Sequence, residues 1–252
     1  MKNTFKKLTD DLQLSSIKEI KAEFQFQGKS HLSKIYTDYT ERAHKLGLIL
    51  VPEWWGLNEY AEKRAQILAQ KGYTVMALDV FGDGAIASDP PRAIVLTKPY
   101  YEDGELVKKL AKEALATLKK HEVDSDRIGI IGYCFGGYFA IHAGTNVKDF
   151  KVAVGFHPSL APIQPQAHIG TKVLVCHGGD DDFEKDHVAE FKEKMGAAQI
   201  DYTFQSYPGS KHAFTNPGAD ANGDKFHIPT RYNAAADAAS WEDLSVFLEK
   251  YL

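Results

Sequence analysis

The stretch from Arg127 to Tyr138, RIGIIGYCFGGY, decides how this chain folds. Its first half is an apolar run typical of a strand buried on both faces, and the residues after it have the pattern of a buried helix. Between the two, Gly132, Cys134 and Gly136 form a Gly-x-Cys-x-Gly turn. The glycines are needed because a side chain at either position would collide with the neighbouring strand or helix. The stretch therefore predicts a strand, a strained turn that presents the Cys134 thiol, and a helix.

The same alternation of strand and helix continues on both sides of this turn. Apolar or β-branched runs typical of strands occupy residues 46–51, 73–79, 127–131, 151–156, 172–176 and 201–207. Helical patterns occupy residues 58–71, with Asn58 as the N-cap, and residues 104–120, 135–144, 184–195 and 232–251. Apolar strands that alternate with helices predict an α/β fold with a mostly parallel central sheet and helices on both faces.

Three further segments complete the predicted organisation. Residues 22–27 and 31–37 alternate polar and apolar side chains around Gly-Lys-Ser, which predicts a short N-terminal antiparallel hairpin. Residues 81–101 and 208–231 are interpreted as long loops, and loops of this length in a compact domain usually border a functional site. We expect one domain over residues 1–252, because a single α/β domain of this length is common.

Composition and charge narrow the classes of partner. With 44% hydrophobic and 25% charged residues, the chain has the composition of an ordinary globular protein. A net charge of −4 offers no basic surface for phosphates, so we expect neither nucleic acid nor a membrane as partner. The N-terminus lacks the apolar segment of a secretory signal, and Cys134 and Cys176 make neither a disulfide framework nor a zinc pattern. These features indicate a cytoplasmic protein that acts on a small molecule.

Cys134 is predicted to be a nucleophile. At the N-terminus of a helix its thiolate is stabilised by the helix dipole, and the backbone N–H of Phe135 points toward an oxyanion that forms on attack. The second N–H is expected from the loop after an early strand, and we assign it to Trp54. The competing interpretation is a buried structural cysteine, which is the one we favour for Cys176.

A base and an acid follow the nucleophile in the order that this turn predicts. Residues 177–183, HGGDDDF, follow one predicted strand, and residues 208–214, PGSKHAF, follow the next. His212 is then the base that accepts the thiol proton, and an aspartate orients its ring. From position alone, this aspartate could be Asp180, Asp181 or Asp182. At least two of the three must have another role, for example as solvent-exposed residues of an acidic turn.

The chain resembles the dienelactone hydrolase family of the α/β-hydrolase superfamily. The resemblance extends from about residue 46 to the C-terminus and rests on PEWWGL, LDVFGDG, GYCFGG and GSKHAF. It implies an α/β-hydrolase fold and a Cys-His-Asp triad of Cys134, His212 and Asp181. It also implies that Glu53, beside the nucleophile, holds or deprotonates the thiol. Independently of the resemblance, the position of Glu53 between a buried strand and two tryptophans predicts a buried carboxyl with a shifted pKa.

The sequence departs from the family where the substrate is held. Members that cleave dienelactones are similar in using arginines to bind a substrate carboxylate, but the corresponding loops here contain Asp83 and Asn216. Arg92 or Arg231, from the long loops, could bind the carboxylate in their place, although arginines in such segments are more often ordinary surface residues. By loop position, Trp55, Phe81, Tyr133 and His157, together with Trp54, are predicted to line the substrate pocket.

A cysteine nucleophile restricts the leaving group. The tetrahedral intermediate expels its better leaving group, and a thiolate leaves more readily than an alkoxide. We therefore expect a carboxylic ester or lactone hydrolase that acts on enol or aryl esters. A thioesterase or amidase, and a redox or ligand-binding protein in which Cys134 is oxidised, remain alternatives.

No cofactor or metal is expected. The segment from Asp220 to Arg231 is similar to a calcium loop, but Lys225 stands where that loop needs glycine and Arg231 where it needs glutamate.

Overall fold

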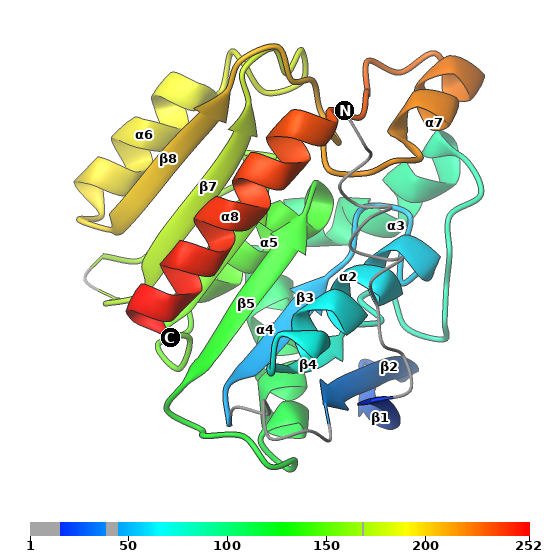
Figure 1. The fold of residues 1–252 in the computed structure, drawn as a ribbon, viewed down its shortest axis with the longest axis vertical. Helices are drawn as coiled ribbons and strands as arrows, with labels where there is room; N and C mark the ends of the chain where they lie inside the picture. Colours follow the sequence, from blue (N-terminus) through cyan, green and yellow to red (C-terminus); the bar gives the residue numbers. More distant parts are fainter. Residues whose placement is uncertain (1–15, 39–44, 168) are drawn as a thin grey trace.

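An eight-stranded sheet forms the centre of the part of the chain that the computed structural model describes, residues 16–38, 45–167 and 169–252. Its strands are β1 (Ile17–Phe26), β2 (Lys29–Asp38), β3 (Gly47–Val51), β4 (Thr74–Ala77), β5 (Ile128–Tyr133), β6 (Val152–Phe156), β7 (Lys172–Gly178) and β8 (Asp201–Tyr207). They are ordered β1-β2-β4-β3-β5-β6-β7-β8 (Figure 1). β2 is antiparallel to β1 and β4, and every other pair of neighbours is parallel. The predicted mostly parallel sheet with an antiparallel N-terminal hairpin is confirmed.

Helices cover both faces of the sheet. They are α2 (Glu59–Gln70), α3 (Pro90–Glu102), α4 (Gly104–Leu118), α5 (Phe135–Gly144), α6 (Val188–Ala197), α7 (Ala219–Phe226) and α8 (Ala234–Tyr251). α4, α5 and α6 share an apolar cluster with Ile49, whereas α2 and α8 share another with Leu48 and Leu50. Successive residues of β3 thus point to opposite layers, and the strand is apolar throughout because both of its faces are buried.

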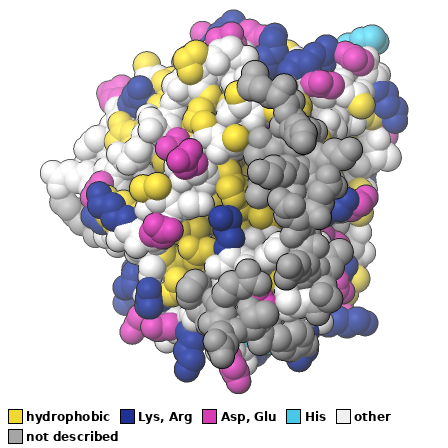
Figure 2. All heavy atoms as spheres, in the orientation of Figure 1, with side chains coloured by type: hydrophobic (Ala, Val, Ile, Leu, Met, Phe, Trp, Pro, Cys, Tyr) yellow, Lys and Arg dark blue, Asp and Glu magenta, His cyan; other side chains and the backbone are white. Residues whose placement is uncertain are grey.

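α2 and α8 lie in front of the sheet in Figure 1. A groove between them is lined by Leu68, Tyr73, Trp241, Leu244 and Leu248. Figure 2 shows apolar side chains gathered near the middle of this face, with acidic and basic side chains scattered around them.

The hairpin is longer than the sequence predicts and has a tight turn. β1 and β2 pair in register from Ile17 with Asp38 to Phe26 with Lys29. Gln27 and Gly28 connect them, and both have positive φ, 48° and 77°. This two-residue geometry matches the right-handed twist of the strands, so pairing starts directly beside the turn.

The two segments interpreted as long loops each contain a helix, so that prediction is wrong for α3 and α7. α3 begins after Asp89, whose carboxylate accepts the backbone N–H of Arg92. Pro90 is tolerated in its first turn, where no helical N–H is needed. Both helices border the candidate site described below, as expected of these segments.

α6 begins later than predicted, at Val188 instead of residue 184. Residues 182–187 form turns, and the Glu184 carboxylate accepts the backbone N–H of Leu160. Among the described residues, no helix is both long and apolar enough to cross a membrane.

Candidate active site

The turn after β5 has the geometry that its glycines predicted. Cys134 lies between β5 and α5 with φ of 54°, a left-handed conformation that is strained for a residue with a side chain. A Cβ on Gly132 would lie 1.8 Å from the carbonyl oxygen of Gly136. A Cβ on Gly136 would lie 2.3 Å from the carbonyl oxygen of Val51, on β3. Only glycine fits at either position.

The structure brings Cys134, His212 and Asp181 together from the ends of three strands. His212 Nε2 lies 3.1 Å from Cys134 Sγ, and His212 Nδ1 lies 2.7 Å from Asp181 Oδ2. All three residues are buried, and the second Asp181 oxygen accepts the backbone N–H of Phe183 at 3.0 Å. Such an arrangement can move a proton from sulfur to the imidazole ring while the carboxylate fixes the ring.

The neighbouring aspartates are placed differently. Asp180 and Asp182 are exposed, and Asp182 pairs with Lys185 and Lys211. Of the three consecutive aspartates, Asp181 is therefore the one that contacts His212.

The electrostatic surroundings of His212 favour its protonated form. Burial alone would lower the pKa of the ring, but the Cys134 sulfur and the Asp181 carboxylate raise it well above its ordinary value. The protonated ring would lie between two groups that can carry negative charge.

Glu53 follows β3 and is 3% exposed. Its Oε2 accepts a hydrogen bond from Asn216 Nδ2 at 2.6 Å, whereas its Oε1 has no hydrogen-bond partner among the described residues. Burial raises the pKa of Glu53 to about 7, although the Asn216 hydrogen bond and the charge of His212 oppose the rise. A carboxyl in this state can give or take a proton near neutral pH.

A cavity of about 330 Å³ lies beside these groups. Glu53 and His212 line it, and α3 and α7 contribute to its walls. Most of the wall is apolar, with Trp54, Trp55, Ile94, Phe183, Ala219 and Ile228 among the residues that form it. Tyr101, which the sequence did not single out, also lines the cavity, and its hydroxyl lies 3.0 Å from Ser159 Oγ.

Three of the predicted pocket residues do not line this cavity. Phe81 stacks on Phe135 with ring centroids 5.7 Å apart, and Tyr133 stacks on Phe156 at 4.8 Å. His157 is fully buried and pairs with Thr215. Tyr133 directly precedes Cys134, so the alternation of β5 turns it toward the layer of α2 and α8 instead.

The two arginines considered as substrate ligands are also outside the cavity walls. Arg92 lines a separate pocket with Phe81 and Tyr100, and Arg231 forms an ion pair with Asp224 at 2.6 Å.

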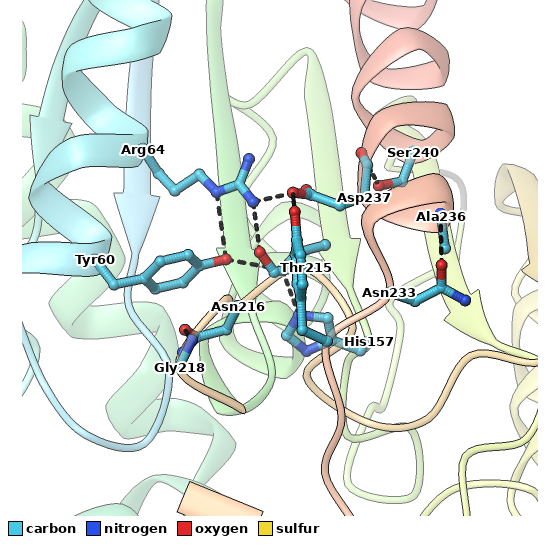
Figure 3. A network of polar contacts seen from close by, with 11 residues as sticks. Tyr60, Arg64, His157, Thr215, Asn216, Gly218, Asn233, Ala236, Asp237 and Ser240 are labelled. Carbon is cyan, nitrogen blue, oxygen red and sulfur yellow. Dashed lines mark hydrogen bonds and ion pairs between the residues drawn. The ribbon is translucent and has the colours of Figure 1, made fainter. Parts of the chain in front are cut away.

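A buried ion pair between Arg64 and Asp237 holds Thr215, which follows His212 in the chain (Figure 3). Arg64, on α2, donates through one nitrogen to Asp237 on α8 and to the carbonyl oxygen of Thr215, each at 2.6 Å. The Thr215 hydroxyl lies 2.8 Å from both Tyr60 Oη and His157 Nε2. These contacts fix the residue beside Asn216, the partner of Glu53.

Sequence reasoning did not single out this network. An arginine within the apolar stripe of α2, between Ala61, Ala65 and Leu68, is the signal that could have indicated it.

The second cysteine has different surroundings. Cys176 lies within β7, is fully buried, and accepts a weak contact from Tyr207 Oη at 3.5 Å. Burial raises the pKa of its thiol to about 12. Both cysteines are free thiols.

Among the described residues, no group of three or more His, Cys, Asp or Glu side chains could hold a metal ion.

Comparison with known proteins agrees with the resemblance seen in the sequence. The model of the dienelactone hydrolase family matches residues 35–252. The chain is 26% identical to a probable 2-oxo-3-(5-oxofuran-2-ylidene)propanoate lactonase of Bradyrhizobium sp., over 81% of this chain and 84% of the relative. It is 24% identical to a carboxymethylenebutenolidase of Rhodococcus opacus, over 81% of each chain.

Among solved structures, the chain is similar to a dienelactone hydrolase-like promiscuous phosphotriesterase from metagenomic libraries. The TM-score is 0.84 at 26% identity, and the match covers 94% of this chain and 99% of that one.

Proposed function

The chain belongs to the dienelactone hydrolase family and is a hydrolase of the lactone or ester type, and from that premise we propose that it acts through a cysteine nucleophile. In this proposal Cys134 attacks the carbonyl carbon of an activated ester or lactone, with His212 as base and Asp181 as its orienting acid. The observation that carries the proposal is the continuous contact from Cys134 Sγ through His212 to Asp181.

The first half of the reaction transfers the acyl group to sulfur. His212 takes the Cys134 proton, and the sulfur forms a bond to the carbonyl carbon while the carbonyl oxygen becomes an oxyanion. The backbone N–H groups of Phe135 and Trp54 are the proposed donors to that oxyanion. Phe135 is the first residue of α5, where the helix itself does not use the N–H. When the intermediate collapses, His212 returns the proton to the departing oxygen and a thioester remains on Cys134.

The second half releases the acid. His212 takes a proton from water, the resulting hydroxide attacks the thioester carbon, and the sulfur departs and regains a proton from His212. Glu53 is the proposed second proton carrier of the site, because its pKa of about 7 lets it exchange a proton at neutral pH. Its unpartnered Oε1 is the atom that we assign to this exchange.

The arrangement favours hydrolysis over a redox or ligand-binding function of Cys134. A thiol that is only oxidised needs no base oriented by a carboxylate, whereas acyl transfer needs both the base and its orientation.

The test is a panel of acetate esters with aryl, enol and alkyl leaving groups: phenyl, vinyl and ethyl acetate. We expect kcat/KM to fall by at least about 100-fold from the phenyl to the ethyl ester, because the thiolate leaves in preference to an alkoxide. The ratio of kcat/KM between the phenyl and ethyl esters must exceed the ratio of their rates of alkaline hydrolysis by hydroxide. This comparison controls for the intrinsic reactivity of the esters. Equal rates on phenyl and ethyl acetate would reject the leaving-group constraint, and undiminished turnover by Cys134→Ala would reject the nucleophile.

A further inference from the structure

The charged side chains that line the cavity are mostly acidic. Glu53, Glu102 and Glu184 contribute three carboxyl groups, and Lys98 and His212 are the basic side chains of the wall among the described residues. Lys98 Nζ lies 3.7 Å from Glu102 Oε1, and both side chains are about two-thirds exposed, at 64% and 65%. This pair is therefore at the rim, where water screens it, and its net charge is zero.

The buried part of the wall has two carboxyl groups. Glu53 and Glu184 are 3% and 6% exposed. Glu184 Oε2 accepts the backbone N–H of Leu160 at 2.8 Å and lies 3.3 Å from His187 Nδ1. Burial raises the pKa of both carboxyls, because their surroundings disfavour negative charge. His212 is the buried basic side chain of this wall, but its two ring nitrogens already contact Asp181 and Cys134. A third carboxylate brought in by a substrate would therefore meet the same unfavourable surroundings.

Asn216 is a polar side chain of the wall whose amide already makes a hydrogen bond at each end. Asn216 Nδ2 donates to Glu53, and Asn216 Oδ1 accepts the backbone N–H of Gly218 at 2.8 Å. Its amide therefore has a structural role on the wall. The remaining surface is largely apolar, formed by side chains such as Trp55, Ile94 and Phe183. Apolar surface favours an apolar substrate group, whereas a charge moved there from water loses its hydration.

We propose that the cavity selects uncharged esters or lactones with an apolar acyl group and excludes substrates that bear a carboxylate. This inference rests on the proposed function, because it names the substrate class of that site. It also explains the position of Asn216: a neutral amide holds Glu53 without adding positive charge that would attract an anion.

The test compares two 4-nitrophenyl esters of the same shape and leaving group. One is the mono-4-nitrophenyl ester of adipic acid, which ends in a carboxylate, and the other is 4-nitrophenyl 6-methylheptanoate, which ends in an isopropyl group. At pH 8 we expect kcat/KM to be at least about 100-fold higher for the isopropyl ester, because the carboxylate must be desolvated beside like charges. An adipate ester that reacts equally fast or faster overturns the inference.

Two variants locate the cause. Glu184→Gln removes one buried negative charge but keeps an acceptor for Leu160, so we expect the discrimination to fall by about tenfold. Lys98→Gln is the matched control at the rim, and we expect it to leave the discrimination unchanged. If wild type accepts the adipate ester and Lys98→Gln loses it, Lys98 is an anion site and the inference is wrong.

A binding measurement separates this inference from the proposed function. The Cys134→Ala variant is titrated by calorimetry with 6-methylheptanamide and with adipic acid monoamide, which need no hydrolysis. Tighter binding of the neutral amide supports the inference even if no ester is cleaved, in which case the proposed function alone fails. Equal binding, or tighter binding of the carboxylate, overturns the inference whatever the kinetics show.

Discussion

Cys134 and Cys176 have the same side chain at nearly the same depth, yet their surroundings differ in every respect that matters for reactivity. Cys134 is 9% exposed and Cys176 is 0% exposed. Cys134 leaves its strand in a left-handed turn and contacts His212, whereas Cys176 continues β7 within an apolar cluster and accepts a contact from the Tyr207 hydroxyl. Under the proposed function, backbone geometry and a charged partner, more than exposure, set the nucleophilic thiol apart from the structural one.

The largest expected effect is the loss of activity when the first cysteine is replaced. Cys134→Ala should lower kcat on an aryl ester by about 10⁵-fold or more, the scale seen when a nucleophile that works with a base is removed. Cys176→Ala is the matched control and should stay within about threefold, because its sulfur contacts Tyr207, which is not part of the candidate site. Steady-state kinetics on both variants makes the measurement. Comparable losses would abolish the distinction between the two thiols.

The next prediction concerns Asp181, which orients His212, the partner that Cys134 has and Cys176 lacks. Asp181→Asn should lower kcat by about 10⁴-fold, because an amide no longer fixes the His212 ring in the tautomer that accepts the thiol proton. Asp182→Asn is the control, since that exposed side chain pairs only with surface lysines in its described ion pairs. If the two variants lose activity equally, Asp181 is not the orienting acid.

The turn that sets Cys134 apart can be broken without touching a reactive group. Gly132→Ala should lower the free energy of unfolding by at least about 3 kcal/mol, because its Cβ would lie 1.8 Å from the backbone of Gly136. Gly196→Ala, on α6, meets nothing within 4 Å and should be neutral or stabilising by about 0.5 kcal/mol. Urea unfolding of both variants measures the difference, and a fully stable Gly132→Ala variant would contradict the packing of the turn.

The carboxyl group beside Cys134 gives a smaller, pH-dependent effect. Burial raises the pKa of Glu53 from 4.5 to about 7, so the native state holds its proton more tightly than the unfolded state. The stability from this group is fully present below pH 4.5 and is lost as the pH rises to about 7. Glu53→Gln should therefore gain up to about 3 kcal/mol over wild type between pH 5 and pH 8.

Unfolding titrations at several pH values measure this gain, with the exposed Glu242→Gln as control. If the free energy of unfolding depends on pH in the same way in wild type and in Glu53→Gln, Glu53 is not buried as described.

Local sequence was enough to predict most of the fold. The apolar runs of β3, β5 and β6 are buried on both faces, so their composition alone identified them. α3 was missed although Asp89 and Pro90 form a standard helix start, because the whole of residues 81–101 was interpreted as one long loop. α7 is only eight residues long, too short for a clear periodic pattern.

The contacts that complete the candidate site depend on tertiary packing, so they were harder to predict from the sequence. Arg64 and Asp237 are 173 residues apart, and only the docking of α8 beside α2 brings them together. Asn216 was noted in the sequence as unable to attract an anion, but its hydrogen bond to Glu53 spans 163 residues. Tyr133 and His157 lie at the ends of strands, where a pocket was expected. Both side chains instead point into the core, and each is fully buried.

The most direct test of the central claim is to identify the residue that carries the acyl group. The protein is mixed with excess 4-nitrophenyl acetate, quenched in acid within one turnover, digested and analysed by mass spectrometry. The account predicts an acetyl group on the peptide that contains Cys134, none on the peptide that contains Cys176, and no adduct in Cys134→Ala. Acetylation of another residue in wild type, retained in Cys134→Ala together with hydrolysis, would contradict it.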